Sequence, residues 1–152
     1  LNVQFTPMGR LLCGGTNRGW PVRGIKPFAL QRLNWTGRMP FEIKRINITP
    51  DGFKFTFTKP VDDKTGNNAK AYKITTFTHK YHGGYGGPEV DRTEPVVKSA
   101  KLATDGLSAT IALSELKLGH VHEFNLDGLL DRDKGELLHR HAYYTVNEVP
   151  KR

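Results

Sequence analysis

The sequence predicts an all-β protein: an immunoglobulin- or fibronectin-III-like β-sandwich of about seven strands, preceded by a β extension. Three observations favour this fold. Phe53, Phe55 and Phe57 alternate with polar residues, which is the period-two pattern of a half-buried strand. The 152 residues include 16 glycines and 9 prolines, a composition that favours short strands joined by turns. No segment of about ten residues has helical periodicity.

The phenylalanine strand is expected to lie at the centre of the sandwich. Asp51 and Gly52 form a turn signal before it. Pro60 ends it, because proline has no N–H for the β-ladder. Burial of each ring stabilises the fold by roughly 1.5–3 kcal/mol, so all three rings are expected in one apolar layer.

The chain is expected to divide into a β extension, residues 1–38, and a sandwich, residues 39–150. The extension offers short strands at 2–6, 11–15 and 28–35, which bury too little apolar area to be stable alone. Trp35 and Phe41 are expected to anchor the junction, because Pro40 stiffens the chain between them. The chain begins in mid-pattern, so we expect a fragment or a processed product.

The sandwich strands follow in order at spacings of about 8–15 residues, which is typical of this architecture. A bulge is expected between Ile43 and Ile46. Residues 61–70 are polar and predict a loop or a short helical turn, in which Asp62 serves turn chemistry rather than calcium binding. The expected strands are 41–49, 53–58, 72–81, 96–103, 108–113, 120–126, 137–138 and 142–146, with a polar turn at 131–135.

Composition excludes several classes of function. The formal net charge of +8 comes from scattered basic residues, so a nucleic-acid footprint is not indicated, and an acidic polysaccharide is left as a weak partner. No apolar run reaches the roughly 18 residues of a membrane span. The single Cys13 excludes an internal disulfide and is expected to be a small buried hydrophobe. Nucleophile-elbow, P-loop and dinucleotide-binding motifs are lacking, so neither an active site nor a cofactor is predicted.

Two pairs of histidines raise the question of a metal site. His120 and His122, and likewise His139 and His141, are spaced to lie on one face of a strand. If the two strands form a hairpin, four imidazoles approach a zinc or copper geometry. However, a turn centred near residue 132 offsets the two pairs along the hairpin. Ordinary edge histidines are therefore the preferred interpretation, with a metal site as the alternative.

A glycine-rich stretch at 79–92 is predicted to be the longest loop. Such loops bind ligands, dock on a neighbouring domain or cap the fold. Aromatic rings and hydrogen-bonding side chains are the mixture that sugar recognition requires, so this loop and one exposed indole form a candidate carbohydrate site. Its predicted residues are Trp20, Tyr81, His82, Tyr85, Glu89, Asp91 and Arg92.

Two resemblances emerge from the motifs. Residues 55–62, 105–111, 116–124 and 143–146 follow one another as in bacterial immunoglobulin-like domains. Residues 14–20, 26–33, 35–37, 40–43, 85–89 and 143–147 together resemble the C-terminal part of large exported proteins of planctomycete-type bacteria. Those proteins carry a sugar-dehydrogenase-like β-propeller, often with a c-type cytochrome domain.

The second resemblance implies a function by context. Residues 1–38 would be the end of the last propeller blade, and the sandwich would be a non-catalytic accessory domain that packs on or positions the propeller. The propeller itself and a Cys-x-x-Cys-His haem motif are lacking, so no catalytic residue is carried over. The implied partner is the propeller domain, and the implied location is the periplasm or the exterior. A carbohydrate-binding module is the alternative function.

Overall fold

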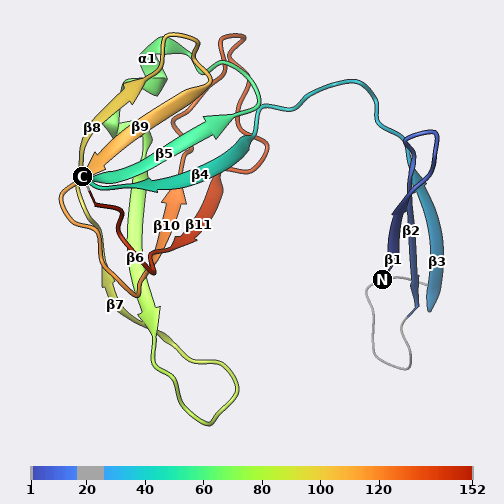
Figure 1. The fold of residues 1–152 in the computed structure, drawn as a ribbon, viewed down its shortest axis with the longest axis horizontal. Coiled ribbons are helices and arrows are strands. Elements are labelled where there is room, and N and C mark those ends of the chain that lie inside the picture. Colours follow the sequence, from blue (N-terminus) through green and yellow to red (C-terminus); the bar gives the residue numbers. More distant parts are fainter. Residues whose placement is uncertain (1, 17–25, 152) are drawn as a thin grey trace. The chain divides into compact units, whose positions relative to one another are not determined.

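The structure is a computed structural model that describes residues 2–16 and 26–151. The chain forms two compact units, Leu1–Arg38 and Met39–Arg152. Each unit is described by itself (Figure 1).

The first unit is a three-stranded antiparallel sheet. Its strands are β1 (Asn2–Phe5), β2 (Leu11–Thr16) and β3 (Phe28–Leu33), in the order β1-β2-β3. The register aligns Phe5 with Leu11 and Leu11 with Leu33, so these apolar side chains share one face. That face also carries Val3, Cys13 and Ala29 beside Gln31.

The apolar side chains of this sheet remain exposed. Phe5 is 72% exposed and Leu33 52%, and Leu30 on the opposite face is 78% exposed. Cys13 is only partly buried, so the expectation of a buried cysteine is wrong. Trp35, which was expected to pack at a junction, is 66% exposed. Within its described residues, the sheet has no buried core of its own.

The second unit is a sandwich of two four-stranded antiparallel sheets, which confirms the predicted fold class (Figure 1). One sheet has the order β4-β5-β9-β8 and the other the order β11-β10-β6-β7. The strands are β4 (Ile43–Thr49), β5 (Gly52–Phe57), β6 (Lys73–His79), β7 (Glu89–Thr93), β8 (Val97–Leu102), β9 (Ser108–Leu113), β10 (Val121–Asn125) and β11 (His141–Thr145).

Aromatic rings from both sheets form the core. Phe53 and Phe55 are fully buried and Phe57 is 2% exposed, which confirms the predicted apolar layer. Across the sandwich, Phe124 meets Phe53 and Phe55 edge-on, with ring centroids 4.9 and 5.1 Å apart. Such edge-to-face pairs are favourable beyond the area they bury. Phe41 is buried in the same core.

A bulge and two turns of the sandwich lie where the sequence predicts them. The register of β4 and β5 shifts between Ile43 and Arg45, at the expected bulge. Gly52 begins β5 where a Cβ would stand 2.1 Å from the Ile111 carbonyl oxygen, so only glycine fits. In the predicted turn at 131–135, the buried Asp131 carboxylate accepts hydrogen bonds from the backbone N–H groups of Asp133 and Gly135, at 3.0 and 2.7 Å.

The polar segment after β5 forms a short helix, α1 (Asp63–Gly66), and a 3-10 helix, η1 (Ala69–Ala71). Asp62 caps α1 by accepting hydrogen bonds from the backbone N–H groups of Lys64 and Thr65, a role for which aspartate is favoured. Lys134 donates a hydrogen bond to Asp62 at 2.5 Å and lowers the pKa of that carboxyl group. Asp62 therefore serves the turn chemistry expected of it.

Two predictions about strands are wrong. Residues 89–93 form β7 rather than loop, and residues 137–138 are not a strand. Glycines and Pro88 hide β7 in the sequence, because they lower the strand propensity of the surrounding stretch. At 130–138, pairing is limited to isolated bridges, one of which joins Leu130 and Glu136.

Candidate ligand-binding surfaces

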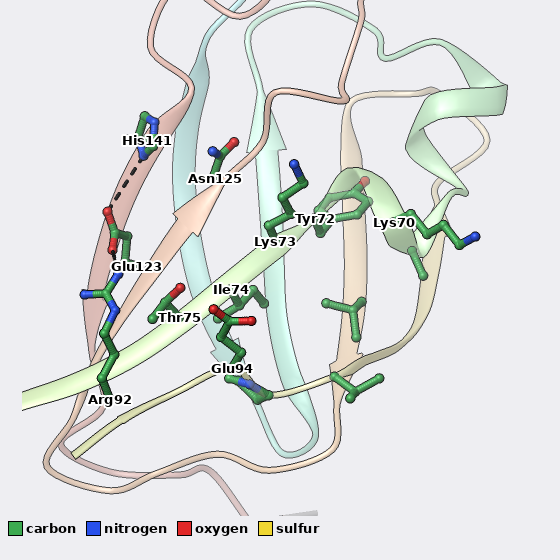
Figure 2. Close-up of a pocket in the computed structure, with 14 residues that line it drawn as sticks. Lys70, Tyr72, Lys73, Ile74, Thr75, Arg92, Glu94, Glu123, Asn125 and His141 are labelled. Carbon is green, nitrogen blue, oxygen red and sulfur yellow. Dashed lines mark hydrogen bonds and ion pairs between the residues drawn. The ribbon is translucent and has the colours of Figure 1, made fainter.

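The outer face of the β11-β10-β6-β7 sheet carries a polar cluster centred on Glu123 (Figure 2). Arg92 contacts Glu123 at 3.3 Å and also pairs with Glu89. The Tyr143 hydroxyl donates a hydrogen bond to Glu123 at 3.2 Å, and His141 lies 3.8 Å from the same carboxylate. This cluster joins side chains of three strands, β7, β10 and β11.

The Glu123 charge also acts on its neighbours. Its negative charge and its hydrogen bond raise the pKa of Tyr143, so the phenol keeps its proton and remains a donor. The Arg92 guanidinium lies over the Phe77 ring at 5.7 Å from the centroid, a cation–π geometry. Phe77 is thereby covered, with 6% exposure, although it lies on the outer face of the sheet.

A groove of about 610 Å³ adjoins this cluster at the edge of β6 (Figure 2). The sequence explains why the sheet is open there. β7 pairs with β6 only as far as Thr76, opposite Thr93. Continuing the register would place Pro95 opposite Ile74, and proline cannot donate to the ladder. The chain instead leaves the sheet, and Lys73, Thr75, Glu94 and Asn125 line the space.

A second groove, of about 650 Å³, lies where β4 and β11 form the edges of the two sheets. His141 lines both grooves, so β11 separates two adjoining hollows. The second groove is lined by Glu42, Ile43, Lys44, Arg45, Ile46, His139, His141, Ala142, Tyr143 and Tyr144.

The predicted loop site is divided between a loop and a strand. Tyr81 and Tyr85 are fully exposed in the loop that joins β6 and β7, whose tip lies away from the two sheets (Figure 1). His82 shapes this loop, because its Nδ1 accepts a hydrogen bond from the Gly84 N–H at 3.1 Å. A Cβ on Gly84 or Gly87 would stand 3.1 Å from the His82 ring. Trp20 lies outside the described residues.

The other three predicted residues belong to β7. Glu89 and Arg92 join the cluster on the outer face. Asp91 lies at a bulge in β7 with a φ of 53°, in the left-handed region, and bulges re-aim side chains in this way. Its carboxylate accepts hydrogen bonds from His120 Nε2 at 2.8 Å and Lys117 Nζ at 3.2 Å, which lower its pKa. The loop and the strand therefore do not present these residues as one site.

The four histidines do not converge. His120 pairs with Asp91, His139 with Glu42 at 2.5 Å, and His141 lies near Glu123. His122 is fully buried against the Phe53 ring. Among the described residues, no group of three or more histidine, cysteine, aspartate or glutamate side chains is arranged to hold a metal ion. Strands β10 and β11 form the predicted hairpin, but its register places His122 opposite Tyr144 rather than opposite another histidine.

Sequence reasoning missed several polar residues of the outer face outside β7, although it named His141 as a metal candidate. Glu123, Asn125, Tyr143 and Thr75 were assigned to strands but to no site. The signal that finds them is alternation: residues 121, 123 and 125 point away from the buried side chains at 122 and 124. Once the strand order is known, residues 143, 123 and 75 lie in one cross-strand row.

Among known proteins, the chain is similar in structure to surface-layer (S-layer) proteins. No family model matches the chain, and no curated protein matches it. A crystal structure of a recombinant form of the S-layer protein SbsC matches with 29% identity and a TM-score of 0.54, over 72% of this chain and 14% of that one. The N-terminal part of the bacterial protein SbsC matches with 27% identity and a TM-score of 0.54, over 72% of this chain and 24% of that one.

The chain thus spans less than a quarter of the length of these S-layer structures. The likeness of this chain to S-layer proteins is consistent with a non-enzymatic β-sandwich. In the part of the chain that the structure describes, no helix is long and apolar enough to span a membrane.

Proposed function

We propose that this chain is a non-catalytic accessory part of a larger exported protein. In this proposal the sandwich is an immunoglobulin-like module, and residues 1–38 complete a neighbouring β-domain, for which the sequence resemblance names a sugar-dehydrogenase-like propeller. The module packs on or positions that domain. The likeness to bacterial S-layer proteins supports a location at the cell exterior.

One observation carries the proposal: the sheet β1-β2-β3 exposes an apolar face. Val3 is 55% exposed, Phe5 72% and Leu33 52%. A three-stranded sheet needs a packed face for stability, and exposed apolar patches of this kind mark interaction surfaces. A segment that completes a neighbouring β-domain would gain the packed face that it needs, and the apolar patch would be its contact surface.

Hydrogen exchange tests this proposal. In dilute protein, residues 2–15 are expected to exchange much faster than 53–58 and 121–126, because an unpartnered sheet opens at low free energy. In the full-length parent protein, residues 2–15 should become protected. Equal protection of all three segments in the isolated monomer would contradict the proposal.

A matched pair of variants sharpens the test. Phe5→Ser removes an apolar side chain from the exposed face, whereas Gln4→Ser changes the neighbouring position on the opposite face. In the parent protein, Phe5→Ser should abolish the protection of residues 2–15 and Gln4→Ser should preserve it. Equal effects of the two variants would argue against docking through this face.

A second candidate function is sugar binding by the β6–β7 loop. It is favoured by the full exposure of Tyr81 and Tyr85 on a loop that His82 holds in shape. Exposed rings supply flat faces for stacking on sugars. A glycan array comparing the wild type with a Tyr81→Ala/Tyr85→Ala double variant tests this function, and identical array profiles would exclude the loop.

A further inference from the structure

The groove between β4 and β11 has an uneven charge. Four basic side chains line it, and Glu42 is the one carboxylate among its ten lining residues. Glu42 is already engaged, because its carboxylate accepts hydrogen bonds from His139 at 2.5 Å and from the Ile43 N–H at 2.9 Å. Lys44 and Arg45 form no ion pair with any described residue. Two cations are therefore available to an anionic ligand.

An aromatic ring stands beside these cations. Tyr143 lines the groove and is 60% exposed. Its hydroxyl donates to Glu123 at 3.2 Å, which favours this orientation of the ring. An exposed aromatic face next to cations suits a ligand that has both an apolar C–H face and a negative charge.

The groove continues across β11 into polar surroundings. Because His141 lines both hollows, a ligand seated on Tyr143 reaches the groove that contains Asn125 and Lys73. Each hollow lies within the size range of small-molecule sites, about 300–1,000 Å³. Together they offer room for several linked rings rather than one.

The carboxylates distinguish between two kinds of polyanion. Glu42 and Glu123 have lone pairs that accept hydrogen bonds from hydroxyl groups. A DNA backbone presents phosphates, which only accept hydrogen bonds and therefore cannot donate to these carboxylates. A sugar presents hydroxyl groups, which also donate. The mixture of unpaired cations, carboxylate acceptors and an aromatic ring therefore favours an acidic sugar.

We propose that the groove between β4 and β11 binds an acidic oligosaccharide. The carboxylates of the sugar form ion pairs with Lys44 and Arg45, and one sugar ring stacks on Tyr143. This site is distinct from the Tyr81–Tyr85 loop and does not depend on the accessory role of the chain. Its binding should weaken as salt rises, because exposed charges are screened.

Affinity electrophoresis of the full chain tests the proposal. The probes are polygalacturonate, alginate and hyaluronan, which are three different uronic-acid polymers. Fully methyl-esterified polygalacturonate is the matched control ligand, because it keeps the sugar rings and loses the charge. Retardation is expected with at least one uronate and not with the ester.

Protein variants locate the site. Lys44→Gln/Arg45→Gln should weaken binding about tenfold, which corresponds to the loss of two partly exposed charge contacts. Lys98→Gln/Lys101→Gln makes the same change of charge on β8, outside the groove, and should leave binding within about twofold. Tyr143→Ala should weaken binding about tenfold, whereas Tyr143→Phe keeps the ring and most of the affinity. Tyr81→Ala/Tyr85→Ala should have no effect.

Several outcomes would overturn the proposal. It fails if none of the three uronates retards the protein, or if the ester binds as well as the acid. Equal losses in the β4 and β8 charge variants would mean that net charge alone drives binding. Tighter binding of a single-stranded DNA oligomer than of any uronate would assign the groove to nucleic acid instead.

Discussion

The buried His122 should make the sandwich sensitive to acid. Its side chain is fully buried against Phe53, and its Nε2 has no hydrogen-bond partner. Burial lowers the pKa of this imidazole below its ordinary value of 6.5, and the charge of the nearby His120 adds to the effect. In the unfolded chain the ring takes up a proton near its ordinary pKa, while in the folded chain it resists.

The sign and size of the effect follow from proton linkage. Below pH 6.5 the unfolded state binds more protons than the folded state, so stability is complete above that pH and is lost as the pH falls. Each pH unit between the ordinary and the lowered pKa costs about 1.4 kcal/mol. Between pH 7.5 and 5.5 this group should therefore reduce stability by at most about 1.4 kcal/mol, a drop in melting temperature of at most about 5 °C.

The assay is urea unfolding at both pH values, for the wild type and for His122→Leu. Leucine fills the site without titrating and leaves no unpaired nitrogen, so the variant should fold at pH 7.5. Wild-type stability should fall more than that of the variant, by at most about 1.4 kcal/mol. The control His139→Gln removes a histidine that is 75% exposed and should retain the wild-type loss. Identical pH dependence in the wild type and His122→Leu would refute the reasoning.

Three further predictions concern stability and metal binding. Phe55→Ala should cost about 3–5 kcal/mol, because the ring is fully buried against Phe124 and Tyr72; an unchanged urea midpoint would contradict it. Asp131→Ala should cost about 2–4 kcal/mol, because it leaves two backbone N–H groups and Lys59 without their acceptor, whereas a similar loss in the exposed Asp133→Ala would point to the turn as a whole. Zinc and copper should bind no better than millimolar, because each histidine is committed to its own environment; micromolar affinity by titration calorimetry, lost in His120→Ala, would overturn this.

The features that sequence reasoning predicted are those set by local pattern. The phenylalanine strand, the bulge near Ile43 and the turn at Asp131 each depend on residues close together in the sequence. Strand β7 was missed because its pairing with β6 outweighs a weak local preference. The exposure of Trp35 was missed for a related reason, because a single aromatic residue does not reveal which surface will cover it.

The candidate sites depend on contacts between strands that are distant in the sequence. Arg92 and Glu123 are 31 residues apart, and Glu42 and His139 are 97 apart. No spacing rule links such positions until the strand order is known. The predicted loop site shows the converse, since Tyr85 and Asp91 are neighbours in sequence but belong to a loop and to a strand bulge.

The histidines of β10 show how depth in the fold decides chemistry. His120 and His122 have the spacing of a metal-binding pair. At the end of the strand, both ring nitrogens of His120 face oxygen acceptors, the Leu118 carbonyl at 3.0 Å and Asp91 at 2.8 Å, so both can donate only when the ring is cationic. Two residues further along the strand, the surrounding core lowers the pKa of the His122 imidazole and so favours its neutral form. The same motif therefore ties the β7 bulge to the sheet at one residue and limits acid stability at the other.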